Sequence, residues 1–280
     1  MSGGTLLRRD PPRIRFSLYN VSLVLVVLIA IAAIFAPVLA PYDPLGQDIL
    51  QRLKGPTGAH WLGTDELGRD VLSRILFGLR SSLTISAGAV AVALFFGSIL
   101  GLLAAYYKGW ADRIIMRLMD VLFAFPVMLL AIGVIALLGP GGFPTAIAIA
   151  IVYTPIFARL LRAPALVVAT SDYVLSARSI GASDLRIIVF HILPNIASVI
   201  LVQVSLLLSS AILVEASLSF LGLGTQPPVP SLGMMLSEGR NFLFLAPWPA
   251  VFSGLAILIV AFALNLFGDA LRDGLDPRLK

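Results

Sequence analysis

Cysteine is absent from this 280-residue sequence, and charged residues are scarce. The absence of cysteine excludes a disulfide framework, thiol catalysis and metal sites with thiolate ligands. Charged residues make up 12% of the chain, against about 25% in an average soluble domain. Hydrophobic residues make up 59%, so the composition excludes a soluble globular domain and indicates a membrane protein with several spans.

Sequence signatures of catalysis are also missing. The chain has no G-x-x-x-x-G-K-[ST] motif to hold ATP in a P-loop, and no G-x-S-x-G motif marks a serine nucleophile. The two histidines, His60 and His191, are predicted on opposite sides of a membrane and cannot share a metal. We therefore expect no catalytic residue, no metal and no cofactor bound by this chain. The energy for any transport must come from an ion gradient or from a separate subunit.

Long apolar runs occupy most of the chain, and a helix needs roughly 20 apolar residues to cross a bilayer. Six segments meet this requirement, so we predict an all-α membrane protein with six transmembrane helices. They cover residues 18–40, 82–106, 117–138, 144–160, 197–221 and 248–269. Gly97 and Gly101 have the small-xxx-small spacing that predicts close packing against another helix. Residues 1–17 are predicted as a cytoplasmic tail and residues 18–280 as the transmembrane domain.

Positive charge is distributed unevenly between the predicted loops. When the N-terminus is placed inside, most of the 20 Lys and Arg residues fall in the inner loops, as the positive-inside rule requires. Both termini and the loop over residues 171–195 then lie in the cytoplasm, and the segment 41–81 lies outside. The net charge of +5 therefore reflects the membrane topology. The sequence lacks the basic face with interleaved aromatic residues that would indicate nucleic-acid binding.

A polar, helix-forming stretch, Asp172–Asn195, interrupts the apolar sequence between the fourth and fifth predicted spans. Ser171 or Asp172 can cap a first short helix and Ser183 a second. Gly181 between them tolerates the left-handed backbone that ends a helix, and Pro194 is predicted to stop the second helix. A membrane protein has little reason to keep such a helix–Gly–helix insert on one face unless a partner docks there.

The outer segment over residues 41–81 is too long for a simple turn. Apolar residues at helical spacing from Val71 to Leu79 predict an amphipathic helix. This helix is expected to begin near Thr64 or Asp65, to lie at the outer interface and to lead into the second span. Its polar side chains either pair with one another and meet lipid headgroups, or dock an external solute-binding protein. The residues concerned are Asp65, Arg69, Asp70 and Arg74.

The 171–195 loop resembles the cytoplasmic coupling loop of ABC-importer permeases, which has the pattern E-A-A-x3-G-x9-I-x-L-P. The matching residues are Ala177, Gly181, Leu193 and Pro194, whereas Leu175 and Ser176 replace the usual Glu and first Ala. Four further stretches resemble the dipeptide, oligopeptide and nickel branch of these permeases, and most of all its second, C-type subunit. They are Gly63–Leu83, Asp120–Ile132, Glu215–Arg240 and Leu264–Lys280.

This resemblance implies a type I ABC importer fold in a bacterial inner (plasma) membrane. It implies a homologous permease as partner, two ATP-binding subunits that hold ATP and Mg, and an extracytoplasmic solute-binding protein. Di- and oligopeptides are the first solutes implied, and nickel or another non-peptide solute is the alternative. The 171–195 coupling loop is implied to contact the ATPases. The residues expected there are Tyr173, Ala177, Ile180, Gly181, Ala182, Leu185, Leu193 and Pro194.

Two further residues are candidates for the translocation pathway. Glu215 is the one carboxylate predicted well inside a span, and such residues often mark substrate or ion paths. Phe125 lies beside Pro126 in the third predicted span, where the proline is expected to kink the helix. An ion-coupled secondary carrier that uses Glu215 is therefore the alternative to an ATP-driven importer.

Overall fold

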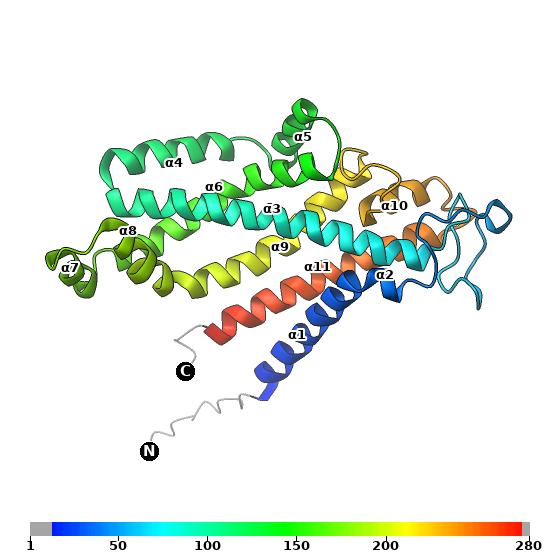
Figure 1. Ribbon diagram of the computed structural model, residues 1–280, viewed down its shortest axis with the longest axis horizontal. Helices are drawn as coiled ribbons and strands as arrows, with labels where there is room; N and C mark the ends of the chain where they lie inside the picture. Colours follow the sequence, from blue (N-terminus) through cyan, green and yellow to red (C-terminus); the bar gives the residue numbers. More distant parts are fainter. Residues whose placement is uncertain (1–12, 276–280) are drawn as a thin grey trace, which may run out of the picture.

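A computed structural model describes residues 13–275, and these residues form helices and loops without any β-strand (Figure 1). Residues 1–12 of the predicted tail lie outside the described residues. The elements, in chain order, are α1 (Arg13–Ile34), α2 (Ala36–Leu39), η1 (Ile49–Gln51), α3 (Val71–Tyr107), α4 (Gly109–Phe123), α5 (Val127–Leu138), α6 (Gly142–Val168), α7 (Asp172–Ser179), α8 (Asp184–Ile187), η2 (Ile188–Ile192), η3 (Leu193–Ile196), α9 (Ala197–Phe220), α10 (Leu232–Arg240) and α11 (Trp248–Leu275).

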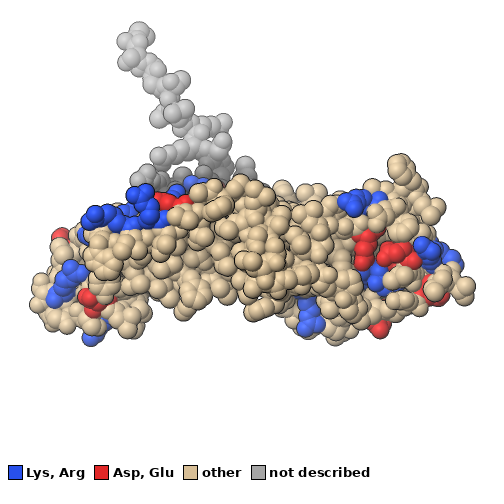
Figure 2. Space-filling view, turned by 90° about the horizontal axis from the view of Figure 1, so that it is seen from above, with Lys and Arg blue, Asp and Glu red and all other residues tan. Residues whose placement is uncertain are grey.

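The long helices lie roughly along one axis of the molecule (Figure 1). Helices α7 and α8 are at one end, which we call the α7 end. Helix α10 and the loops before α3 are at the other end, which we call the α10 end. On the face that Figure 2 shows, Lys, Arg, Asp and Glu gather toward these two ends, and an uncharged band separates them. Charged side chains are costly inside a lipid bilayer, so a surface that the bilayer covers is expected to be uncharged, as this band is.

Four helices among the described residues are long and apolar enough to cross a membrane. They are Val71–Tyr107, Gly142–Val168, Asp184–Phe220 and Trp248–Gly274. A fifth candidate is the pair α4 and α5, and the apolar helix Tyr19–Ile34 is shorter than these. Each predicted span lies largely in helix, but length and composition identify four crossings among the described residues, or five with the bent pair.

The third predicted span, residues 117–138, is broken near Pro126, where only a kink is expected from the sequence. The chain breaks between Phe123 and Val127, and α5 is turned by 91° from α4. Pro126 precedes the first residue of α5 and lacks the N–H that a continuous helix would use there. The proline therefore does more than kink the span, because it separates two helices that run in different directions (Figure 1).

Helices α3 and α6 pack closely through glycine, as the small-xxx-small spacing predicts. A Cβ atom added to Gly97 would lie 2.5 Å from the Cβ of Phe157, and one added to Gly101 would lie 2.5 Å from the carbonyl oxygen of Ala158. Neither site has room for a side chain. The two backbones therefore approach more closely at these positions than larger residues would allow.

The expected amphipathic helix before the second span does not exist as a separate element. Residues 63–70 form loops, and α3 begins at Val71. Asp70 is its N-cap, and the carboxylate accepts a hydrogen bond from the backbone N–H of Ser73 at 2.8 Å. From there α3 continues for 37 residues, so the part predicted to lie at the interface is the first section of one long span.

Candidate functional site

The 171–195 segment contains the two predicted short helices, α7 and α8, at one end of the molecule. Gly181 between them has a φ of +84°, which is the left-handed conformation expected of it. Ser171 and Ser183 occupy the N-cap positions, but neither side chain caps its helix. The hydroxyl of Ser171 instead donates to the carbonyl oxygen of Val168 at 2.6 Å.

The prediction that Pro194 stops the second helix is wrong. After α8 the chain passes through a π-helical turn, Ile188–Ile192, and a 3-10 turn, Leu193–Ile196, directly into α9. Pro194 lies in the first turn of the 3-10 element, directly after the π-helical turn, and this local change of hydrogen-bond pattern accommodates its missing N–H. Residues Asp184–Phe220 therefore form one continuous helical path, and π-helical turns of this kind are frequent at functional sites.

Most residues expected to contact an ATPase lie on the surface of this segment. Tyr173 is 45% exposed, Ile180 is 86% exposed and Leu185 is 72% exposed. Gly181 and Pro194 are also exposed, and Ala182 and Leu193 are partly buried. Ala177 is the exception, because it is buried against the rest of the molecule and cannot offer its side chain to a partner.

Two tyrosines at the end of α3 hold this segment in place. The hydroxyl groups of Tyr106 and Tyr107 donate to the two carboxylate oxygens of Asp184 at 2.6 and 3.2 Å. The guanidinium of Arg178 lies 4.9 Å above the ring of Tyr106. Apolar residues of α7 and of the turns after α8 complete the contact with α3 and α6. They are Val174, Ile187, Ile188, Ile192 and Ile196, packed on Leu102, Ala105, Leu161 and Ala165.

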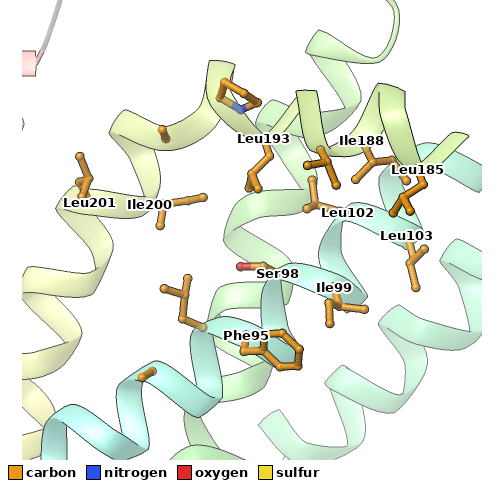
Figure 3. A pocket seen from close by; sticks show the side chains of 15 residues that line it. Phe95, Ser98, Ile99, Leu102, Leu103, Leu185, Ile188, Leu193, Ile200 and Leu201 are labelled. Atoms are coloured by element: carbon orange, nitrogen blue, oxygen red, sulfur yellow. The ribbon is translucent and has the colours of Figure 1, made fainter. Parts of the chain in front are cut away.

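An apolar cavity of about 920 Å³ lies between α3 and residues 185–201. Figure 3 shows Phe95, Ile99 and Leu102 of α3 facing Leu185 and Leu193 across it. The cavity leaves part of the 185–201 stretch without packing partners in α3. The buried side chains Ile187, Ile188 and Ile192 hold the other side of this stretch against α3 and α6.

At the α10 end, the four polar residues considered for docking are almost completely buried. Asp65 accepts a hydrogen bond from Arg69 Nε at 2.7 Å and another from Arg74 Nη1. Arg74 Nη1 also donates to Glu238 Oε2 of α10 at 3.1 Å. We call Asp65, Arg69, Arg74 and Glu238 the ion-pair cluster. These side chains pair with one another, which is the first of the two alternatives given for them, and their burial leaves little of their surface for a binding protein.

Asp70 is equally enclosed, and it organises the start of α3. Its carboxylate caps the helix, accepts a hydrogen bond from the Ser73 hydroxyl at 2.7 Å and lies 2.9 Å from His60 Nδ1. The indole of Trp248 in α11 donates to the carbonyl oxygen of Thr64 at 2.8 Å. The 41–70 segment is thus tied to α3, α10 and α11, which gives it a fixed shape.

Glu66 lies at the edge of the cluster, where its Oε1 accepts from Arg69 Nη2 at 3.1 Å. Burial raises the pKa of Glu66, and repulsion from the neighbouring Asp65 carboxylate adds to that effect. The proton is therefore held more strongly by Glu66 here than in an exposed glutamate.

Glu215, the candidate carboxylate for the pathway, does not line an open surface. Its side chain is fully buried in α9, and one carboxylate oxygen accepts from the Ser219 hydroxyl at 2.7 Å. The second carboxylate oxygen has no hydrogen-bond partner among the described residues. Phe125 is 55% exposed at the bend between α4 and α5, a position compatible with a pathway or with lipid.

Sequence reasoning missed three of the residues that organise these sites. Asp184 and Tyr106 are separated by 78 positions, and Glu238 and Arg74 by 164. No local pattern links such partners, although Asp184 lies in the polar stretch between the fourth and fifth predicted spans. That placement is a signal for a buried or functional carboxylate but gives no information on its partner.

Comparison with known proteins gives two family matches. Residues 97–280 match the family model of the binding-protein-dependent transport system inner membrane component. Residues 20–56 match the model of the N-terminal TM domain of oligopeptide transport permease C. Together the two matches cover most of the described residues.

Curated relatives resemble nearly the whole chain. A glutathione transport system permease protein of Pectobacterium atrosepticum is 52% identical over 256 residues, which are 91% of this chain and 85% of the relative. A dipeptide transport system permease protein of Alkalihalophilus pseudofirmus is 45% identical over 260 residues, which are 93% of this chain and 86% of the relative.

A solved structure shares the fold. The MetNI methionine ABC transporter, in an inward-facing conformation, matches with a TM-score of 0.59 and 14% identity. The match covers 74% of this chain and 96% of the MetNI chain. At this identity the likeness concerns the fold alone.

Proposed function

The chain belongs to the family of binding-protein-dependent transport system inner membrane components and is a permease subunit of an ABC importer, and we propose that it carries small peptides. Its relatives are named for glutathione and for dipeptides, which supports a di- or oligopeptide as solute. In this proposal the chain forms half of a transmembrane pathway, and the other half comes from a homologous permease of different sequence.

The pathway half contains six crossings, counted with α1 and with the bent pair α4 and α5. The N-terminus, the C-terminus and the 171–195 segment lie in the cytoplasm. This orientation is supported by the excess of Lys and Arg in the loops that it places inside. An extracytoplasmic binding protein delivers solute to the α10 end, where the 41–70 segment and α10 form a rigid surface.

The 171–195 segment is the coupling loop that docks on the ATP-binding subunits. The single observation that carries this part of the proposal is the exposure of Tyr173, Ile180 and Leu185 on a segment that Asp184 fixes to α3. Exposed apolar side chains on a rigidly held helix pair are the usual anchors of a protein interface. The buried side chain of Ala177 packs α7 against the rest of the permease and makes no contact with the ATPase.

ATP binding and hydrolysis in the partner subunits move this segment, and the spans follow. The bonds between Asp184 and the two tyrosines transmit the displacement to α3. The cavity between α3 and residues 185–201 gives the rest of the segment room to shift during that movement. No covalent chemistry occurs in this chain.

The experiment that tests the docking is a pull-down of the tagged permease from native membranes in mild detergent. Tyr173→Asp combined with Ile180→Asp places two charges on the exposed face and leaves Leu185, which lines the cavity, unchanged. We expect the partner permease to remain and the ATP-binding subunits to be lost. The matched control is Phe244→Asp, another exposed apolar residue, at the α10 end. Retention of the ATP-binding subunits by the double variant would exclude this face as the docking surface.

A further inference from the structure

Helices α4 and α6 enclose a second polar site, which neither the coupling loop nor the ion-pair cluster includes. It is a groove of about 460 Å³ on the side of the molecule toward the α7 end. We call it the α4–α6 groove. Its lining consists of Asp112, Arg113, Met116, Arg117, Asp120, Arg159 and Arg162. Four of these residues are arginines and two are aspartates, so the groove has a net charge of +2.

The two aspartates neutralise only the arginines of α6. Asp112 forms a two-point ion pair with Arg162, with distances of 2.5 and 2.6 Å to Nε and Nη2. Asp120 pairs with Arg159. Arg113 and Arg117 of α4 form no salt bridge with any residue that the structure describes. The positive charge of the groove that remains available to a ligand is therefore on α4.

The groove lies beside an apolar stripe on the same helix. Trp110, Ile114, Leu118 and Val121 are all exposed, and their spacing places them along one face of α4. The groove residues of α4 lie on an adjacent face. A ligand that fits both surfaces has an anionic group and a long apolar part. The exposed tryptophan at the start of α4 is the type of residue that sits at the level of lipid headgroups.

The polar surface is confined to one end of the molecule. Beyond Phe123 the chain bends by 91°, and α5 has the sequence VMLLAIGVIALL, which contains no polar side chain. A route for a polar solute would need polar groups beyond this point as well. The basic and acidic side chains instead stop at the edge of the uncharged band (Figure 2). This position favours a lipid headgroup over a transported solute.

We propose that the α4–α6 groove binds the phosphate of an anionic phospholipid from the leaflet at the α7 end. Arg113 and Arg117 contact the phosphate, because they are four residues apart on one helix and have no carboxylate partner. The acyl chains lie along Ile114 and Leu118. The ion pairs of Arg159 and Arg162 with the two aspartates fix the far wall of the groove. Basic pockets between helices on one side of a membrane are established binding sites for such headgroups.

The test uses the complete transporter, purified with its partner subunits in detergent and titrated with phosphatidylglycerol or phosphatidylethanolamine. Bound lipid is counted by native mass spectrometry. Each arginine close to an anionic headgroup contributes about fivefold to binding, so Arg113→Gln with Arg117→Gln should weaken phosphatidylglycerol binding about 25-fold. Binding of phosphatidylethanolamine should not change. Arg80→Gln, at an exposed arginine near the start of α3, is the matched control and should bind as the wild type does.

Two further measurements separate loss of charge from loss of folding, and lipid binding from binding of a free anion. Arg113→Lys with Arg117→Lys retains the charge and should bind far better than the glutamine variant, which separates loss of charge from loss of folding. Inorganic phosphate is the probe for the free anion. If phosphate displaces the lipid at equal concentration, the acyl chains contribute nothing and the lipid assignment is wrong. The assignment is also wrong if the glutamine variant binds phosphatidylglycerol normally while uptake of a peptide with a free carboxylate falls.

Discussion

Replacing Asp65 by Asn should destabilise the α10 end of the protein strongly. Asp65 and Arg74 side chains are each 2% exposed, and the Asp65 carboxylate contacts both arginines of the ion-pair cluster. It also accepts two backbone hydrogen bonds, from Leu67 and Arg69, each at 2.9 Å. Asparagine keeps the size of the side chain, removes its charge and turns an N–H donor toward groups that can only donate.

The structure sets the magnitude of this effect. Without the Asp65 charge, Arg74 retains Glu238 as its only ionic partner, and its Nε and Nη2 already have no hydrogen-bond partner among the described residues. Removing one partner from a buried ion pair costs about 3–5 kcal/mol, because it leaves a charge buried without compensation. Glu238 is 26% exposed and well placed to pair with Arg74, so we expect the lower part of that range.

The assay is equilibrium unfolding of the purified protein in detergent, with limited proteolysis of the 41–70 segment as a local readout. Asp43→Asn is the matched control, because Asp43 is exposed and its carboxylate accepts a local hydrogen bond from the backbone N–H of Leu45. Such a surface change should stay within about 0.5 kcal/mol of the wild type. A cost below about 1 kcal/mol for Asp65→Asn would refute the account of the cluster as a buried, mutually dependent network.

Two other substitutions test the roles of Glu215 and Glu66. Glu215→Gln should leave ATP-driven uptake near the wild-type rate, because the amide oxygen can still accept a hydrogen bond from the Ser219 hydroxyl. An ion-coupled carrier would instead lose uptake in this variant, and an uncoupler would abolish uptake by the wild type. Burial raises the pKa of Glu66, so its contribution to stability is complete below its unfolded-state pKa and is lost as the pH rises through the higher folded-state pKa. Glu66→Gln should therefore raise the unfolding midpoint relative to the wild type at pH 7 but not at pH 4, and an equal difference at both values would contradict this assignment.

Much of the helical framework could be predicted from the sequence. Apolar runs of sufficient length identify spans because a bilayer imposes both composition and length on a helix. The break at Gly181 was predictable for a similar reason, since few other residues adopt its backbone conformation at no cost. The close approach of α3 and α6 at Gly97 and Gly101 also followed from local spacing. In each case the physical constraint acts on neighbouring residues.

The remaining features depend on contacts between distant residues. A local pattern places Arg69 and Arg74 on a polar face, but burial of that face requires Glu238 and α10. Pro194 was expected to end a helix, and a π-helical turn before it lets the chain continue. The 91° turn at Phe123–Val127 likewise exceeds what a proline alone dictates. Tertiary packing decides these outcomes, and one sequence contains no direct record of it.

Helix α3 joins the two ends of the molecule without a break. Its first turn is held by Asp70 and the ion-pair cluster, and its last two residues hold Asp184. Its 37 residues give a rod about 55 Å long, so a tilt of about 5° about one end displaces the other by about 5 Å. That displacement is close to one helical turn. A small rotation of α3 at the ion-pair cluster thus moves its other end far enough to displace a protein bound there.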